Sequence, residues 1–238
     1  MKDNKNYDLG IIGGMGTEAT VELFRRITER THANCDQDYM RVLILNDSKI
    51  PDRSKSIKLG SSDPLDYINE DIKRLEKIGV KYFIIPCNTA HYYAKDFKSQ
   101  TVEFINMISE TLMVIKRDYS DKKVCILGTD GTIYSGVYFD NEEAKGLKFL
   151  KLSKELQDKV MNVVTLTKEG KNKDEIFKTL NSVITSVKEK EKDVLFVLAC
   201  TEISLYKDYL KNEFFIDAMD VLVDKAITKC GYKLKERE

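Results

Sequence analysis

Two cysteines that end similar apolar segments are the residues of this chain best suited to chemistry. Cys87 follows the apolar run 82–86, and Cys200 follows the apolar run 194–199. Neither run alternates polar and apolar residues, which is typical of strands buried on both faces of a parallel sheet. Small polar residues follow each cysteine and suit a turn and a helix start. Because open α/β sheets bind ligands at the carboxyl ends of their strands, we expect the two thiols to face each other across one small substrate.

A glycine-rich turn, residues 13–16, follows the first predicted strand at 8–12 and precedes an amphipathic helix. Such glycines let the backbone approach a ligand, and a helix N-terminus favours an anion. The glycine spacing also fits a dinucleotide-binding fingerprint, which requires an acidic residue at the end of the second strand. Asp36 and Asp38 instead precede the second predicted strand, 41–45. The order of these residues therefore argues against NAD binding.

Two further side chains are candidates for the site. Arg53 lies in the loop after the second predicted strand. An arginine there could clamp a carboxylate with two parallel hydrogen bonds, although a solvated loop charge is the simpler interpretation of the residue alone. His91 follows Cys87 by four residues and would share its face of a helix. A Cys/His nucleophile pair is possible, but a structural histidine is favoured.

The organisation of the chain repeats once. A strand and a glycine-threonine turn recur at 123–132, and nearly equal separations lead from Gly13 to Cys87 and from Gly128 to Cys200. This repeat predicts two flavodoxin-like α/β halves related by a pseudo-twofold axis, with the active site in the cleft between them. We expect the first half to comprise residues 1–104 plus the C-terminal strand and helix in 212–238. The second half would comprise 105–211.

Composition excludes several classes of function. The 238 residues contain 39 Lys+Arg and 39 Asp+Glu, so no net charge favours nucleic acid or a membrane surface as partner. The five cysteines include no close CxxC pair, which disfavours a disulfide framework and a zinc site. The polar start lacks the apolar core of a signal peptide, and the apolar runs are too short to span a membrane. We expect a reduced, cytoplasmic protein without a metal.

Five motifs occur in order over most of the chain. They are Ile12-Gly13-Gly14-Met15-Gly16, Ile50-Pro51-Asp52-Arg53, Pro86-Cys87-Asn88-Thr89-Ala90-His91, Gly131-Thr132-Ile133 with Ser135-Gly136-Val137-Tyr138, and Cys200-Thr201-Glu202. Together they resemble the aspartate/glutamate racemase family, its aspartate racemase branch in particular. Thr17 stands where the family usually has proline, and Ala199 where it commonly has glycine. Neither departure removes a reacting group.

The resemblance implies racemisation of an acidic amino acid without pyridoxal phosphate or any other cofactor, by a homodimeric enzyme. One cysteine, as thiolate, would remove the Cα proton from one face, and the other, as thiol, would return a proton to the opposite face. Nearby positive charge, a helix N-terminus or hydrogen-bond donors lower the pKa of a thiol. The sequence leaves open which of Cys87 and Cys200 is the resting thiolate.

The resemblance also implies a set of substrate-binding residues. These are Met15, Gly16, Arg53, Asn88, Thr89, Thr129, Thr132, Lys168 and Thr201, with His91 and Glu202 in supporting roles. Within this set, Arg53 matches the clamp for the side-chain carboxylate. Lys168, expected in a loop before Gly170, matches a second cation.

We expect interconversion of L- and D-aspartate, with glutamate as a possible substrate. The alternatives are a sister reaction on the same scaffold, of the maleate isomerase or malonate decarboxylase type, and a non-catalytic binder of acidic amino acids. A binder has no need of two cysteines at opposed strand ends, so the thiol pair separates these hypotheses.

Overall fold

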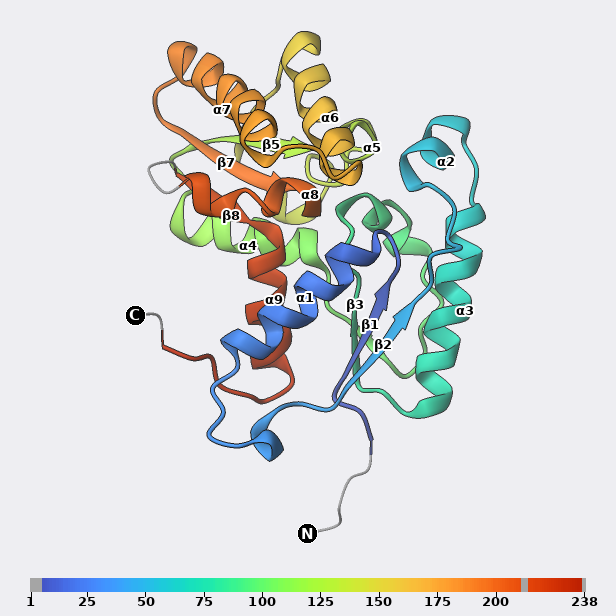
Figure 1. The fold of residues 1–238 in the computed structure, drawn as a ribbon. Helices are drawn as coiled ribbons and strands as arrows, with labels where there is room; N and C mark the ends of the chain where they lie inside the picture. The colour runs from blue at the N-terminus through green and yellow to red at the C-terminus, as the bar shows by residue number, and fades with distance from the viewer. Residues whose placement is uncertain (1–5, 211–213, 237–238) are drawn as a thin grey trace.

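Two four-stranded parallel sheets with flanking helices organise the chain, which a computed structural model describes for residues 6–210 and 214–236 (Figure 1). The strands are β1 (Leu9–Gly13), β2 (Val42–Asn46), β3 (Tyr82–Ile84), β4 (Glu103–Phe104), β5 (Lys123–Gly128), β6 (Lys148–Leu150), β7 (Val194–Ala199) and β8 (Phe215–Asp217). The α-helices are α1 (Thr17–Arg30), α2 (Arg53–Leu59), α3 (Asp63–Ile78), α4 (Met107–Asp118), α5 (Asp130–Tyr134), α6 (Lys154–Lys168), α7 (Lys173–Lys190), α8 (Thr201–Ser204) and α9 (Ala218–Lys229). Short 3₁₀ helices are η1 (Asp36–Asp38), η2 (Asn88–Asp96), η3 (Glu142–Ala144) and η4 (Lys207–Leu210).

The two sheets have the same strand order. It is β2-β1-β3-β4 in the first sheet and β6-β5-β7-β8 in the second, with every neighbouring pair parallel. The central strands β1 and β7 are buried at every position, which explains their continuous apolar sequences. The prediction of two similar α/β halves is therefore confirmed.

Helices cover both faces of each sheet, and two of them cross between the halves. In the first half α3 packs on one face and α1 with α9 on the other, while in the second α6 and α7 pack opposite α4. The helix α4 follows β4 of the first sheet but packs on the second. Conversely, α9 follows β8 of the second sheet but packs on the first. This reciprocal exchange ties the halves together, with α4 and α9 packed against each other (Figure 1).

The exchange corrects one expectation about the C-terminal segment. Sequence reasoning assigned its strand and helix together to the first half, whereas β8 pairs with β7, with Leu198 opposite Asp217. Only α9 covers the first sheet. An apolar strand pattern identifies a strand but not the neighbour that it pairs with, and the expected boundary at residues 211 and 212 lies outside the described residues.

Candidate active site

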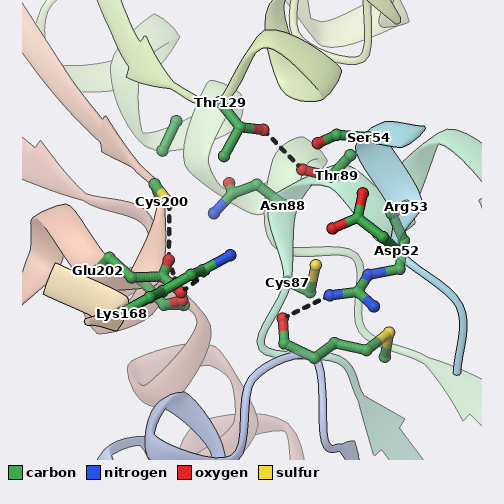
Figure 2. A pocket seen from close by; sticks show the side chains of 13 residues that line it. Asp52, Arg53, Ser54, Cys87, Asn88, Thr89, Thr129, Lys168, Cys200 and Glu202 are labelled. Carbon is green, nitrogen blue, oxygen red and sulfur yellow. Dashed lines mark hydrogen bonds and ion pairs between the residues drawn. The ribbon is translucent and has the colours of Figure 1, made fainter. Parts of the chain in front are cut away.

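A pocket between the two halves contains both cysteines that the sequence singled out. It encloses about 40 Å³ and adjoins an outer cavity of about 380 Å³. Ten of the predicted site residues line the inner pocket: Met15, Arg53, Cys87, Asn88, Thr89, Thr129, Lys168, Cys200, Thr201 and Glu202 (Figure 2). Gly16 lines the outer cavity, while Thr132 and His91 line neither.

Strand ends bring the two cysteines to this pocket. Cys87 follows β3 after a tight turn at Ile85 and Pro86 and precedes η2, and Cys200 follows β7 directly and precedes α8. Both have an extended backbone, with φ of −152° and −148°. Both are buried, with exposed fractions of 8% and 6%. The repeated topology thus places two thiols, one from each half, on one small space.

The Cys200 thiol donates a hydrogen bond to a carboxylate. Its Sγ lies 2.9 Å from Glu202 Oε2, which also accepts from the Thr201 hydroxyl at 3.2 Å. The other oxygen, Glu202 Oε1, lies 3.7 Å from Lys168 Nζ. Burial, reinforced by the charge of Glu202, raises the pKa of Cys200 well above its usual value. This cysteine is therefore a protonated thiol at neutral pH.

Arg53 lies on the Cys87 side of the pocket and is held by main-chain oxygens (Figure 2). Its Nη1 donates to the carbonyls of Pro51 at 2.9 Å and Ile50 at 3.2 Å, and its Nη2 donates to Met15 at 3.1 Å. Its Nε is buried and has no hydrogen-bond partner among the described residues. The guanidinium is therefore fixed in place, with an unused donor on the edge formed by Nε and Nη2.

A buried tyrosine orients Asn88. The Tyr138 hydroxyl donates to Asn88 Oδ1 at 2.6 Å, so the amide NH₂ group of Asn88 is the part left for the pocket. In Figure 2 this nitrogen points toward the Cys200 side. Tyr138 is completely buried in the second half, so the contact also crosses between the halves.

Three threonine hydroxyls form a mutually bonded triangle behind the pocket. Thr89 from the first half lies 3.0 Å from Thr129 and 2.9 Å from Thr132, which are themselves 3.1 Å apart. A neighbouring glycine permits the approach of Thr89, because a Cβ on Gly131 would lie 2.7 Å from Thr89 Cγ2. Thr132 is 1% exposed and does not line the pocket; it lies behind the lining residues Thr89 and Thr129 and supports them.

Comparisons with known proteins agree with this geometry. A profile of the Asp/Glu/hydantoin racemase family matches residues 12–226. The chain belongs to this family. A solved aspartate racemase of Picrophilus torridus is 34% identical, with a TM-score of 0.83 and 96% of each chain covered. The solved structure of an aspartate racemase homologue from Pyrococcus horikoshii OT3 is 22% identical, with a TM-score of 0.74. The match covers 94% of this chain and 99% of that chain. A broad specificity amino-acid racemase of Bacillus subtilis (strain 168) is 24% identical over 232 residues, 92% of this chain and 96% of that protein.

His91 has a structural position in this racemase. Its Nε2 accepts a hydrogen bond from the Met107 backbone N–H at 3.1 Å, so Nδ1 carries the proton and donates to the Cys87 carbonyl at 2.9 Å. Burial lowers the pKa of His91 to about 4. The ring is neutral at physiological pH, both nitrogens are occupied, and neither faces the pocket. A Cys/His nucleophile pair is thereby excluded.

Gly14 of the first turn packs closely against the protein's own chain. Gly14 has φ of 85°, and a Cβ there would lie 2.3 Å from the Asp47 carbonyl in the loop after β2. The close approach that this glycine permits is to its own chain. This packing agrees with the interpretation of the motif as something other than a dinucleotide site.

Sequence reasoning missed three residues and misplaced one. Asp52 and Ser54 line the pocket, and Tyr138 orients Asn88. Asp52 and Tyr138 lie in the motifs of the racemase family and Ser54 lies beside one, so these motifs could have identified all three residues. Lys168 was expected in a loop but is the last residue of α6, because the helix continues two residues beyond its apolar pattern.

Residues 6–210 and 214–236 contain neither a metal-binding cluster nor a membrane-spanning helix. No group of three or more His, Cys, Asp or Glu residues in these ranges is arranged to hold a metal ion. No helix there is long and apolar enough to cross a membrane.

Proposed function

We propose that this racemase interconverts L- and D-aspartate without pyridoxal phosphate, by a two-base mechanism that uses Cys87 and Cys200. The observation that carries the proposal is the pair of buried thiols that two strand ends direct into one small pocket. Two proton carriers of the same chemical type, on opposite sides of Cα, suit a reaction that runs equally in both directions.

In the proposed mechanism the two thiols start in different roles. Cys200 begins as the thiol, because burial and Glu202 disfavour its thiolate. Cys87, as thiolate, takes the Cα proton, and the C–H electron pair passes to the substrate as a carbanion delocalised into the α-carboxylate. Cys200 S–H then gives its proton to the opposite face of Cα. The products are the other enantiomer, a Cys87 thiol and a Cys200 thiolate, from which the reverse reaction starts.

Arg53 is the proposed clamp for the side-chain carboxylate. Its Nε and Nη2 form the edge of the guanidinium that can bind two carboxylate oxygens at once, and Nε has no protein partner among the described residues. Three backbone carbonyls hold the group, so little conformational entropy is lost on binding. The Asn88 amide and the Thr201 hydroxyl are the proposed donors to the α-carboxylate.

The size of the pocket favours the shorter substrate. The inner space of about 40 Å³ is too small for a whole amino acid, so even aspartate must also occupy part of the outer cavity. Glutamate adds one methylene, a difference worth about 1–3 kcal/mol in a closed pocket. The similarity to the aspartate racemase of Picrophilus torridus supports the same choice.

Proton NMR in D₂O tests the proposal. The purified protein, without added pyridoxal phosphate, is incubated with L-aspartate and separately with L-glutamate, and the Cα proton signal is followed together with chiral analysis. We expect the signal to disappear and the D-isomer to form faster with aspartate. Exchange with neither amino acid would contradict the proposal. Maleate and malonate would then test the sister reactions, and calorimetric binding of aspartate without exchange would identify a binder.

The homodimer and the cytoplasmic location stay predictions. Sedimentation equilibrium of the full chain tests the first, with twice the 27.4 kDa chain mass as the expected result. Fractionation of cells that express the protein tests the second.

A further inference from the structure

The residues four positions after each cysteine are buried and tie the cysteine turn to another element. After Cys87 this residue is His91, which joins the Cys87 carbonyl to Met107, the first residue of α4. After Cys200 it is Ser204, whose backbone N–H donates to the Cys200 carbonyl at 3.0 Å. Because α4 follows β4 and α9 follows β8, the counterpart of the α4 start is the start of α9.

Ser204 reaches that counterpart through its hydroxyl. Its Oγ donates to Asp217 Oδ2 at 2.5 Å, and Asp217 caps α9 by accepting from the Met219 N–H at 3.0 Å. Ser204 is 1% exposed and Asp217 4% exposed. A serine and a carboxylate thus take the place in the second half that one histidine takes in the first.

The second network includes an ion from the opposite half. Arg26 on α1, 2% exposed, donates from Nη1 to Asp217 Oδ2 at 2.6 Å and to Asp220 Oδ1 at 2.9 Å. Its Nη2 lies 3.4 Å from the Ser204 carbonyl, and its Nε donates to Glu22 at 2.6 Å. The helix α1 also follows the Met15 turn, whose carbonyl holds Arg53. One helix therefore connects the proposed carboxylate clamp with the cysteine turn of the other half.

We propose that Arg26 and Asp217 act as positioning residues for Cys200. They hold Ser204, and through it the one-turn helix α8, at a set distance from the first half. Neither residue lines the inner pocket, so the effect on the reaction passes through the Cys200 turn. This inference rests on the proposed racemisation, because one of its tests is a kinetic assay with aspartate. The second test measures the reactivity of the Cys200 thiol and requires no turnover.

The experiment compares two variants with two matched controls. Arg26→Lys keeps the charge but cannot span Asp217, Ser204 and Glu22 together, and its control is Arg30→Lys. Arg30 lies one turn further along α1 and pairs with Asp220 and Asp224, at 3.3 and 2.6 Å, but has no contact with Ser204.

Ser204→Ala is the second variant and removes only the hydroxyl, so it tests the inference even where Arg26→Lys fails to fold. Its control is Thr31→Ala, which removes a buried hydroxyl bonded to the Ile27 carbonyl at 2.7 Å, at the far end of α1. Each protein is assayed for kcat and KM with aspartate, for its melting temperature, and for iodoacetamide labelling of each cysteine by peptide mass spectrometry.

A positioning role predicts a selective result. In Arg26→Lys and Ser204→Ala we expect kcat to fall at least about tenfold with little change in KM, because a small displacement of a reacting group is costly. Labelling of Cys200 should rise severalfold while that of Cys87 is unchanged, and the controls should show neither effect at a similar melting temperature. Changes no larger than those of the controls, or equal increases at both cysteines, would overturn the inference. A wild-type protein without racemisation but with the labelling pattern would instead refute only the proposed function.

Discussion

The two cysteine turns share a scaffold but differ in electrostatic environment. Each follows a central strand of a sheet with the same strand order, and each precedes a short helical segment. Cys200 donates to Glu202, which disfavours its thiolate, whereas Cys87 lies on the side of Arg53. A repeat of topology therefore positions two equivalent thiols, and Glu202 makes the environment of Cys200 different from that of Cys87.

This asymmetry has a limit set by thermodynamics. The two enantiomers of an amino acid have equal free energies, so their equilibrium constant is one and kcat/KM must be equal in the two directions. The different environments of Cys87 and Cys200 can therefore give each enantiomer its own kcat and its own KM, but the ratio kcat/KM must be the same for both. Kinetic tests of the comparison must measure both parameters with both enantiomers.

Removal of either thiol should have the largest effect. In Cys87→Ala or Cys200→Ala one face of Cα loses its proton carrier, so we expect kcat for racemisation to fall at least about 10³-fold. Circular dichroism and the melting temperature should stay near those of the wild type, since both side chains are small. Cys125→Ala, in the buried strand β5, is the control for loss of a cysteine outside the pocket. Full activity in either site variant would exclude the two-base mechanism.

The buried residues that tie the two cysteine turns to neighbouring helices, His91 and Ser204, should respond differently to acid. The pKa of His91 is lowered to about 4 from 6.5, so the unfolded state binds more protons between these values. The free energy of unfolding should therefore fall as pH drops from 6.5 to 4, by up to roughly 3 kcal/mol. Urea denaturation across this range measures the effect. The counterpart in the second half, Ser204 with Asp217, contains no histidine.

Two histidine variants complete this test. His91→Leu should lose about 2–4 kcal/mol at pH 7, because the Cys87 carbonyl and the Met107 N–H lose their partner, and it should lack the decline below pH 6.5. His32→Gln replaces the exposed second histidine and should retain the decline. An acid response that survives in His91→Leu would assign it to other groups.

The cations of the two halves should contribute unequally. Arg53→Lys keeps a charge but loses the two-donor edge of the guanidinium, so we expect kcat/KM for aspartate to fall about 10- to 100-fold, mainly through KM. Lys168→Met should cost less, because Lys168 is about half exposed and pairs with Glu202. The control is Arg74→Lys, which lies outside the pocket. Equal losses at Arg53 and Lys168 would mean that the two cations share the substrate carboxylate.

Sequence patterns predicted the parts of this molecule that depend on local chemistry. Continuous apolar runs located β3 and β7, and the glycine turns and cysteines marked their functional ends. The pairing of β8 with β7 could not be read in this way, because it depends on contacts between distant segments. The Tyr138 contact with Asn88 and the bond from Cys200 to Glu202 depend on side-chain directions that spacing does not specify. The raised pKa of Cys200 followed only from these contacts.

Neutralising the acid beside Cys200 should have the smallest effect and tests the electrostatic difference most directly. Glu202→Gln keeps an oxygen that can accept from the thiol but removes the negative charge that helps to raise the pKa of Cys200. The pKa of Cys200 should therefore fall, and the pH midpoint for its iodoacetamide labelling should move to lower pH, while that of Cys87 stays in place. We expect kcat/KM to fall about tenfold, by the same factor for L- and D-aspartate, with unequal changes in kcat. Glu169→Gln, an exposed acid beside Lys168 in sequence, should change neither quantity. If the Cys200 midpoint instead rose or stayed constant, burial alone would keep this thiol protonated, and the environments of the two cysteines would differ for a reason other than Glu202.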